Sequence, residues 1–264
     1  MKLSIITVNL NNREGLQKTI DSVVSQTFKD FEWIVIDGGS TDGSKALIEQ
    51  YADHMAYWVS EPDKGIYNAM NKGIKVSKGE YLYFLNSGDW LWEPDTLQSV
   101  FEAVDTLPKD CFVYGNYYDR DGLVYSPPEK LDLSLFLNST LCHQAVFHPR
   151  TAFPEEGYDE SLRNVSDWKL LFESIVLRQF PYRKLDFMVC GIQPGCSYDS
   201  SATPAEREKV INGLFPPMVT EALLSWNQME QHSMTPYYRK INGNPKLMRM
   251  TRRMVHFYEK LKCK

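Results

Sequence analysis

The most informative stretch of the sequence is Phe31-Glu32-Trp33-Ile34-Val35-Ile36, which is followed at once by Asp37-Gly38-Gly39-Ser40-Thr41-Asp42-Gly43. The apolar run is typical of a buried strand, and the residues after it favour a turn. A second apolar run, Tyr81 to Leu85, ends in the same way at Asn86-Ser87-Gly88-Asp89. Ligands of open α/β sheets bind beyond the carboxyl ends of the strands, so we expect both turns to present acidic side chains at one functional edge.

The segments around these runs alternate between strand and helix patterns. We predict strands at Leu3–Asn9, Phe31–Ile36, Tyr57–Ser60 and Tyr81–Leu85, and helices at Arg13–Ser25, Gly43–Tyr51, Ile66–Val76 and Asp95–Val104. Alternation of this kind predicts an α/β fold with a mostly parallel sheet flanked by helices.

The pattern changes in the second half of the chain. There we predict a hairpin of Phe112–Tyr118 and Gly122–Tyr125, a helix at Asp167–Leu177 and a strand at Arg183–Ile192. The remainder is helical in pattern, with interruptions at Pro216-Pro217, Pro236 and Gly243. We therefore expect one domain over residues 1–210 and a helical extension over residues 211–264.

Composition limits the class of protein. The chain has 264 residues and 43% hydrophobic content, enough for a sizeable core. Its five cysteines are odd in number and form no Cys-x-x-Cys pair, which argues against a disulfide framework or a zinc knuckle. Its apolar stretches are too short for a signal peptide or a membrane-spanning helix. We expect a cytoplasmic protein, either soluble or peripheral on the inner face of the membrane.

Charge is distributed unevenly. The net charge is -5, yet residues 237–264 hold nine Lys/Arg against the single acid Glu259. The acidic body argues against a nucleic-acid groove. One helical face of the tail is apolar and is flanked by basic residues; it comprises Leu247, Met250, Met254, Phe257, Tyr258 and Leu261. This pattern predicts either a helix lying on an anionic membrane surface, or a helix docked on the body or across a homodimer.

Six segments, taken together and in order, resemble the family 2 glycosyltransferases of the GT-A fold over residues 3–195. The segments are Ser4 to Asn9 with Asn12, Ser22 to Thr27 with Phe31-Glu32, Asp37 to Gly43, Asp63 to Gly73, Gly79 to Asp89, and Gly157 to Glu160 with Ser166-Asp167. Each segment alone is weak, whereas six in the same order are specific.

The resemblance implies a GT-A fold and inverting transfer of a sugar from a nucleotide-diphosphate sugar to a carbohydrate or lipid-linked acceptor. It also implies a divalent metal, Mn²⁺ or Mg²⁺, and a role in bacterial surface polysaccharides. The alternative is a non-catalytic relative that binds nucleotide sugars or glycans and has a degenerate metal motif. A nicotinamide dehydrogenase is disfavoured, because no Gly-x-Gly-x-x-Gly follows the first strand.

The resemblance assigns the nucleotide to the first two strand ends. Asp37 would bind its base or ribose, although an aspartate here also suits a turn that caps the next helix. Thr7 and Asn9 would line the same pocket, and Asn9 is equally suited to bonding the backbone of a turn. Lys64, at the predicted start of a helix, is a candidate phosphate contact, or else a solvated surface lysine.

Asn86-Ser87-Gly88-Asp89 occupies the place of the family's Asp-x-Asp metal motif. Only Asp89 keeps a carboxylate, so we expect Asp89 to bind the metal, with Asn86 and Gly88 beside the nucleotide sugar. Magnesium often uses only one or two protein carboxylates and completes its shell with phosphates and water. The alternative for Asp89 is a cap ahead of Trp90.

Asp167 is the candidate catalytic base, because the resemblance places an acid at the start of the helix after Gly157-Tyr158-Asp159-Glu160. Inverting transfer needs a carboxylate that accepts the proton of the acceptor hydroxyl. An aspartate in a first helical turn is also favoured by the helix dipole. His143 lies between the hairpin and this helix, where it would contact the acceptor or the diphosphate, or serve structure alone.

Overall fold

The computed structural model describes residues 1–119, 121–193 and 203–232. Residues Met1–Arg207 form one compact unit, and a second unit begins at Glu208. The expected domains, 1–210 and 211–264, stay a prediction, since a compact unit is not by itself an independently folding domain. The basic, apolar face predicted for residues 247–261 lies outside the described residues.

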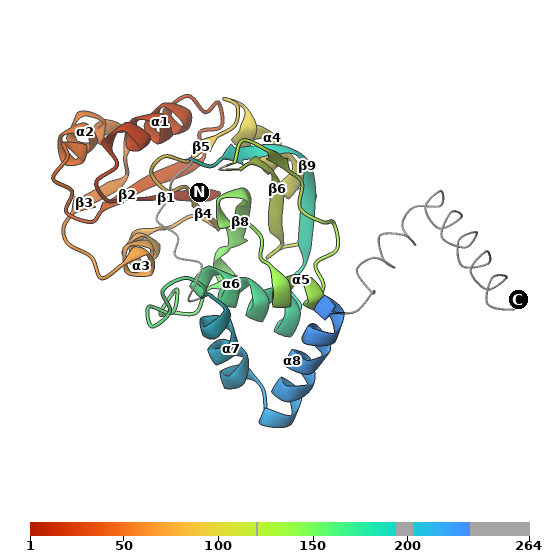
Figure 1. The fold of residues 1–264 in the computed structure, drawn as a ribbon. Helices are drawn as coiled ribbons and strands as arrows, with labels where there is room; N and C mark the ends of the chain where they lie inside the picture. The colour runs from red at the N-terminus through yellow and green to blue at the C-terminus, as the bar shows by residue number, and fades with distance from the viewer. Residues whose placement is uncertain (120, 194–202, 233–264) are drawn as a thin grey trace, which may run out of the picture. The chain divides into compact units, whose positions relative to one another are not determined.

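The strands are β1 Leu3–Asn9, β2 Phe31–Asp37, β3 Tyr57–Ser60, β4 Tyr81–Phe84, β5 Trp90–Leu91, β6 Phe112–Tyr118, β7 Val124–Tyr125, β8 Val146–Pro149 and β9 Tyr182–Gly191. In the described part of the chain these nine strands form one sheet in the order β3-β2-β1-β4-β8-β6-β9-β5, with β7 paired to β6 (Figure 1). The first four are mutually parallel, and β8 enters antiparallel between β4 and β6.

The α-helices are α1 Arg13–Val24, α2 Ser44–Gln50, α3 Ile66–Val76, α4 Thr96–Val104, α5 Leu133–Asn138, α6 Ser166–Leu171, α7 Thr203–Leu214 and α8 Pro217–His232. Two short turns also matter: the 3-10 turn η2 His143–Ala145, and the π-helical turn η4 Phe172–Leu177 that continues α6. No helix within the described ranges combines the length and apolar character needed to cross a membrane.

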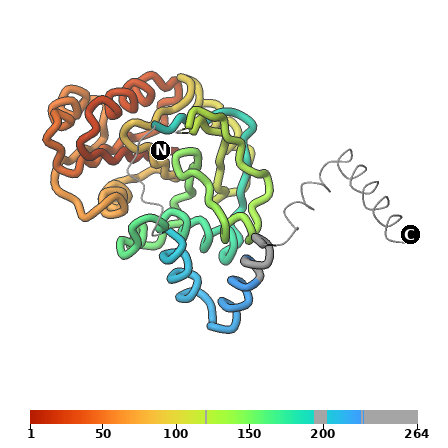
Figure 2. The backbone as a smooth tube through the Cα atoms, in the orientation of Figure 1, coloured from red at the N-terminus to blue at the C-terminus, as the bar shows by residue number. Residues whose placement is uncertain are grey.

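The parallel strands are buried on both faces. Ile5 and Val35 pack with residues of α1, α2 and α4, whereas Ile6 and Ile34 pack with residues of α3 and α6. Figure 1 shows α1 and α2 on one side of these strands and α3 on the other. This double covering explains why the first strands are continuous apolar runs rather than alternating ones. The later strands, yellow to teal in Figure 2, extend the sheet from β4.

The predicted parallel half is confirmed, including a helix whose bounds are Ile66–Val76. Three elements were not predicted, namely β5, α5 and β8. All three are short, and β8 contains a histidine and a proline that obscure its strand pattern. The helix predicted at Asp167–Leu177 is in fact α6 followed by η4, because its hydrogen bonds widen to a π turn after Leu171.

Candidate active site

The ends of β1 and β2 place Asn9 directly opposite Asp37. The Asp37 carboxylate is fully buried and accepts four hydrogen bonds: from Asn9 Nδ2 (2.6 Å), Ser40 Oγ (2.6 Å), the Ser40 amide (2.9 Å) and Ser60 Oγ (2.6 Å). Burial alone would raise the pKa of Asp37, but these hydrogen bonds outweigh it and hold the pKa below its ordinary value. Asp37 is therefore an anion that organises the turn after β2.

A nucleotide contact through Asp37 stays a prediction, and it would require one of those four hydrogen bonds to be exchanged. A second carboxylate, not assigned from the sequence, lies at the same place. A side chain at Gly38 would lie 2.5 Å from Asp63 Oδ2, so Asp63 occupies the space beside Gly38. Its other oxygen accepts from the Gly65 amide at 2.8 Å. Asp63 thus presents one oxygen at the edge of the sheet.

Thr7 and Asn9 differ in whether their side-chain oxygen already has a hydrogen-bond partner within the fold. Thr7 is fully buried, and its Oγ1 accepts from Trp33 Nε1 at 3.0 Å, so its hydroxyl is used inside the fold. Asn9 donates to Asp37, whereas its own Oδ1 is buried and has no hydrogen-bond partner among the described residues. An unpaired buried oxygen costs free energy, so Asn9 Oδ1 is an acceptor that the described part of the fold leaves unused.

The turn after β4 continues beside β1. The Ser87 amide donates to the Val8 carbonyl at 3.0 Å, which places Asn86 and Ser87 next to Asn9. Gly88 has φ +101° and its amide donates to Thr19 Oγ1 at 2.9 Å. A positive φ of this size strains any residue with a side chain, so glycine is required there.

Asp89 is 5% exposed and does not cap a helix, because β5 follows it. Its Oδ1 accepts from the Gln193 amide at 3.0 Å and its Oδ2 from Gln144 Nε2 at 2.9 Å. These two hydrogen bonds fix the orientation of the Asp89 carboxylate.

His143 connects this turn to the start of α6. Its Nδ1 lies 3.2 Å from Asp167 Oδ2, and its Nε2 lies 3.2 Å from Asn86 Nδ2. Asp167 Oδ1 accepts from the Tyr67 hydroxyl at 2.9 Å. Because an ionised carboxylate only accepts, Nδ1 carries the proton, and Nε2 accepts from Asn86. The four side chains form one continuous chain across the edge of the sheet.

This chain fixes the charge of Asp167. Burial alone would raise the pKa of its carboxyl group, but the hydrogen bonds from His143 and Tyr67 outweigh burial and keep the pKa below the ordinary value. The Asp167 side chain is 15% exposed, so a small part of it remains open to a ligand. Conversely, burial and the neighbouring Asp167 raise the pKa of Tyr67, which stays a neutral donor.

Hydrogen bonds therefore connect the three acids that the sequence suggested. Asp37 is bonded to Asn9 on β1, and the turn that contains Asp89 follows β4 and is bonded to β1 through the Ser87 amide and the Val8 carbonyl. Gln144 and His143, adjacent on η2, reach Asp89 and Asp167 respectively. Asp63 and Tyr67 lie in the matched segment Asp63 to Gly73 but were given no role at the site, and Gln144 lies outside the matched segments. Lys64 is exposed at the start of α3, and its phosphate contact stays a prediction.

The described protein residues alone do not supply a complete set of metal ligands. Within the described ranges, no group of three or more His, Cys, Asp or Glu residues is arranged to hold an ion. Oxygen ligands are nevertheless present: the carboxylate of Asp89, and Asn86 Oδ1, which is buried without a hydrogen-bond partner among the described residues. These residues fit an ion that takes most of its ligands from a diphosphate and water.

Comparison with known proteins gives two kinds of likeness. A PGL/p-HBAD biosynthesis glycosyltransferase of Mycobacterium tuberculosis is 34% identical over 170 residues, covering 62% of this chain and 66% of the relative, just under two thirds of its length. An uncharacterized glycosyltransferase of the same species is 44% identical over 181 residues, covering 66% of this chain and 69% of the relative.

Two solved structures share the fold. S. aureus TarS 1-349 in complex with UDP-GlcNAc has a TM-score of 0.67 at 17% identity, covering 89% of this chain and 74% of that one. The mannosyltransferase PcManGT from Pyrobaculum calidifontis, in complex with GDP-Man and Mn²⁺, has a TM-score of 0.63 at 15% identity, covering 89% and 71%. The predicted GT-A fold is thereby confirmed. The sequence also matches the pattern of glycosyl transferase family 2 over residues 4–173, and the chain belongs to that family.

Proposed function

We propose that the protein transfers a sugar from a nucleotide-diphosphate sugar to a hydroxyl of a carbohydrate or lipid-linked acceptor, with inversion at the anomeric carbon. One observation carries this proposal: the ionised Asp167 carboxylate, fixed between Tyr67 and His143 and hydrogen-bonded through His143 to the turn after β4. Membership of glycosyl transferase family 2 supports the same class of reaction.

In this reaction the acceptor oxygen forms a bond to the anomeric carbon while the bond from that carbon to the diphosphate oxygen breaks. The acceptor proton passes to Asp167 Oδ2 or Oδ1, and the nucleoside diphosphate leaves with the electron pair. A carboxylate with a low pKa suffices as the base, because the hydroxyl proton becomes strongly acidic as its oxygen bonds to carbon. His143 and Tyr67 hold Asp167 in place, which keeps its open lone pair directed at one acceptor position.

The donor nucleotide is assigned to the ends of β1, β2 and β4. Asn9 Oδ1 and Asn86 Oδ1 are buried acceptors without protein partners in the described chain, and Asp63 offers a carboxylate oxygen beside Gly38. These three groups suit the hydroxyls of a ribose and the N–H groups of a base, while Asp37 keeps the turn rigid. Lys64, exposed at the start of α3, is the cation we assign to the diphosphate.

Asp89, with the Asn86 amide oxygen, would hold the divalent ion that the family implies. When bound, such an ion neutralises the charge that develops on the leaving diphosphate. Gln144 Nε2 and the backbone amide of Gln193 fix the orientation of the Asp89 carboxylate.

The proposal is tested by a thermal-shift screen of UDP-, GDP- and dTDP-sugars with and without Mn²⁺, followed by a transfer assay with the donor that stabilises most. We expect one donor to raise the melting temperature and to be consumed when a glycan or lipid-linked acceptor is added. Asp53→Asn, at an exposed aspartate on η1 (Ala52–His54), is the matched control for Asp167→Asn. A donor that binds but is neither hydrolysed nor transferred would favour the non-catalytic alternative.

A further inference from the structure

The start of α6 has no side-chain cap of its own. The residue at the N-cap position is Val165, whose side chain makes no capping hydrogen bond, and the helix begins at Ser166. The first amide groups of a helix have no partner within it, so this end of a helix must be held by groups from elsewhere. Because Asp167 is the second residue of α6, whatever fixes the helix start also fixes the candidate base.

Glu206 on α7 binds the chain just before this helix. Its Oε1 accepts from the Arg163 amide at 2.7 Å, and its Oε2 accepts from the Asn164 amide at 2.8 Å. One carboxylate thus binds two consecutive backbone amides, and each oxygen takes one of them. Hydrogen bonds to an ionised acceptor are stronger than those between neutral groups. The partners lie 43 and 42 residues apart in the sequence, so this contact depends on the tertiary fold.

The next residue of α7 contacts the chain just after the base. The Arg207 guanidinium carbon lies 5.2 Å from the centre of the Trp168 ring, a distance at which a cation is attracted to an aromatic face. Trp168 is 1% exposed, and its Nε1 donates to the Phe136 carbonyl at 2.7 Å. Two consecutive residues of α7 therefore contact the chain on both sides of Asp167.

A short path of hydrogen bonds leads from this loop to the base. The Ser166 amide, two residues after Asn164, donates to the Tyr67 hydroxyl at 3.1 Å. The same hydroxyl donates to Asp167 Oδ1 at 2.9 Å. A displacement of the loop before α6 would therefore change both the position of Asp167 and the hydrogen bond that it receives from Tyr67.

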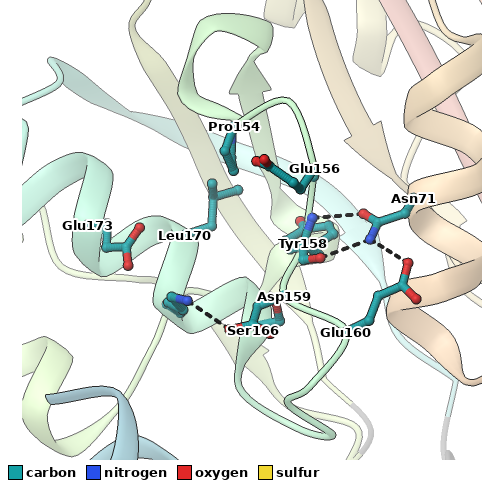
Figure 3. Close-up of a pocket in the computed structure, with 11 residues that line it drawn as sticks. Asn71, Pro154, Glu156, Tyr158, Asp159, Glu160, Ser166, Leu170 and Glu173 are labelled. Carbon is teal, nitrogen blue, oxygen red and sulfur yellow. Dashed lines mark hydrogen bonds and ion pairs between the residues drawn. The ribbon is translucent and has the colours of Figure 1, made fainter. Parts of the chain in front are cut away.

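The earlier part of the same loop is held from α3 instead. Asn71 accepts from the Tyr158 amide at 2.7 Å and donates to the Tyr158 carbonyl at 2.8 Å and to Glu160 at 2.9 Å (Figure 3). The two amides that Glu206 binds come later in the loop, next to the helix start. Glu206 thus acts on the part of the loop that directly precedes the base.

We propose that Glu206 is a positioning residue for the transfer reaction. It fixes the loop before α6, and thereby the direction in which the Asp167 carboxylate faces the acceptor. In this role Glu206 does not touch the reacting atoms and acts only through Asp167. The inference rests on the proposed function, in which Asp167 accepts the acceptor proton. It also gives the first turn of α7 a part in holding the base.

Glu206→Gln tests the proposal, because a side-chain amide has only one acceptor oxygen and leaves one of the two backbone amides without its partner. We expect kcat to fall about tenfold, since a small misplacement of a catalytic group is costly, while donor affinity stays within about twofold. The melting temperature should fall by no more than about 4 °C. Initial rates, donor titration by calorimetry and thermal unfolding measure these quantities. Glu208→Gln removes the same charge from an exposed position on the same helix and should leave kcat unchanged.

A double-mutant cycle with Asp167→Asn separates positioning from a merely structural role. If Glu206 acts through the base, Glu206→Gln should slow the otherwise wild-type enzyme about tenfold but change the residual rate of Asp167→Asn by less than about twofold. The proposal is overturned by an equal loss in both backgrounds, by an unchanged kcat, or by a donor affinity that falls in step with kcat. These results would leave Asp167 as the base. Wild-type turnover in Asp167→Asn itself would instead overturn the proposed reaction mechanism.

Discussion

Asp167 has one hydrogen-bond donor on each carboxylate oxygen, Tyr67 on Oδ1 and His143 on Oδ2. Asp167→Asn keeps the shape of the side chain but removes the base, so the transfer rate should fall by about 10²–10⁴-fold. Donor affinity should stay within about twofold, because the donor contacts other residues. Initial rates and donor titration by calorimetry measure the two quantities. Wild-type turnover in the variant would show that another group accepts the proton.

Tyr67→Phe tests how the base is held. Loss of one donor to Asp167 should raise the pKa of that carboxyl group, since the hydrogen bond favours its charged form. Activity depends on the ionised base, so the acid side of the pH–rate profile should move to higher pH, and the maximal rate should fall about tenfold. Tyr57→Phe, at an exposed tyrosine, is the control. If the acid side of the pH–rate profile does not move, Tyr67 does not position the base.

A substitution at Asp37 should change the stability of the protein. Asp37→Asn turns an acceptor of four hydrogen bonds into a group that accepts fewer, which should cost about 3 kcal/mol of unfolding free energy. The folded-state pKa is lowered, so the carboxylate stabilises the fold fully above the unfolded value near 3.8. That contribution is lost as the pH falls through the lower folded-state pKa. Urea titrations of both proteins over this range measure it, and a pH-independent difference would contradict it.

At the scale of elements, Asp42 connects the starts of two helices. Its carboxylate accepts from the Arg13 amide at 2.8 Å, and from the Ser44 amide and hydroxyl at 3.0 and 2.6 Å. Asp42→Ala should therefore destabilise the protein by about 1–2 kcal/mol, the usual cost of losing an N-terminal cap. Thermal unfolding measures the loss. Asp53→Ala, at an exposed aspartate with no such contacts, should cost much less.

The elements that the sequence predicted well are those with long, uninterrupted patterns. β1 and β2 are apolar throughout because helices cover both faces of the sheet, and α3 has a clear apolar stripe. β8 was missed because its four residues include His148 and Pro149, yet it inserts between β4 and β6 and joins the two halves of the sheet. The antiparallel pairing of β8 with β4 and β6 depends on contacts between segments distant in the sequence, which no local pattern specifies.

The candidate site was predictable to a similar extent. Motif order indicated Asp89 and Asp167, whereas His143 was singled out by its place between the predicted hairpin and the helix that begins at Asp167. The partners that fix them, Tyr67 and Gln144, come from α3 and η2 and were assigned no role from the sequence. Their roles follow from the packing of distant segments, so only the three-dimensional arrangement identifies them. A turn motif likewise does not show that the Asp37 carboxylate accepts four hydrogen bonds.

At the scale of the whole molecule, the sheet divides the work. In the proposed reaction, Asn9, Asp63 and Asn86, near the ends of the parallel strands β1, β3 and β4, would contact the nucleotide sugar, whereas α6 and η2 carry Asp167 and His143. His143 and Gln144 connect the two sides through adjacent residues. Small shifts of η2 therefore change the base and the proposed metal ligand together, which is why substitutions at His143 should affect both acceptor turnover and the metal dependence of donor binding.

The uneven charge of the chain predicts a membrane contact that can be separated from catalysis. Residues 237–264 hold nine basic side chains and one acid. Each basic residue near an anionic leaflet contributes about 1 kcal/mol, so Arg249, Arg252 and Arg253 changed together to Gln should weaken partitioning onto phosphatidylglycerol vesicles about a hundredfold. Changing the exposed Lys45, Lys109 and Lys130 to Gln is the matched control and should have little effect. Vesicle sedimentation at low and high salt measures both. If the tail instead joins two copies of the chain, the Arg variant should change the sedimentation coefficient and leave vesicle binding unaltered.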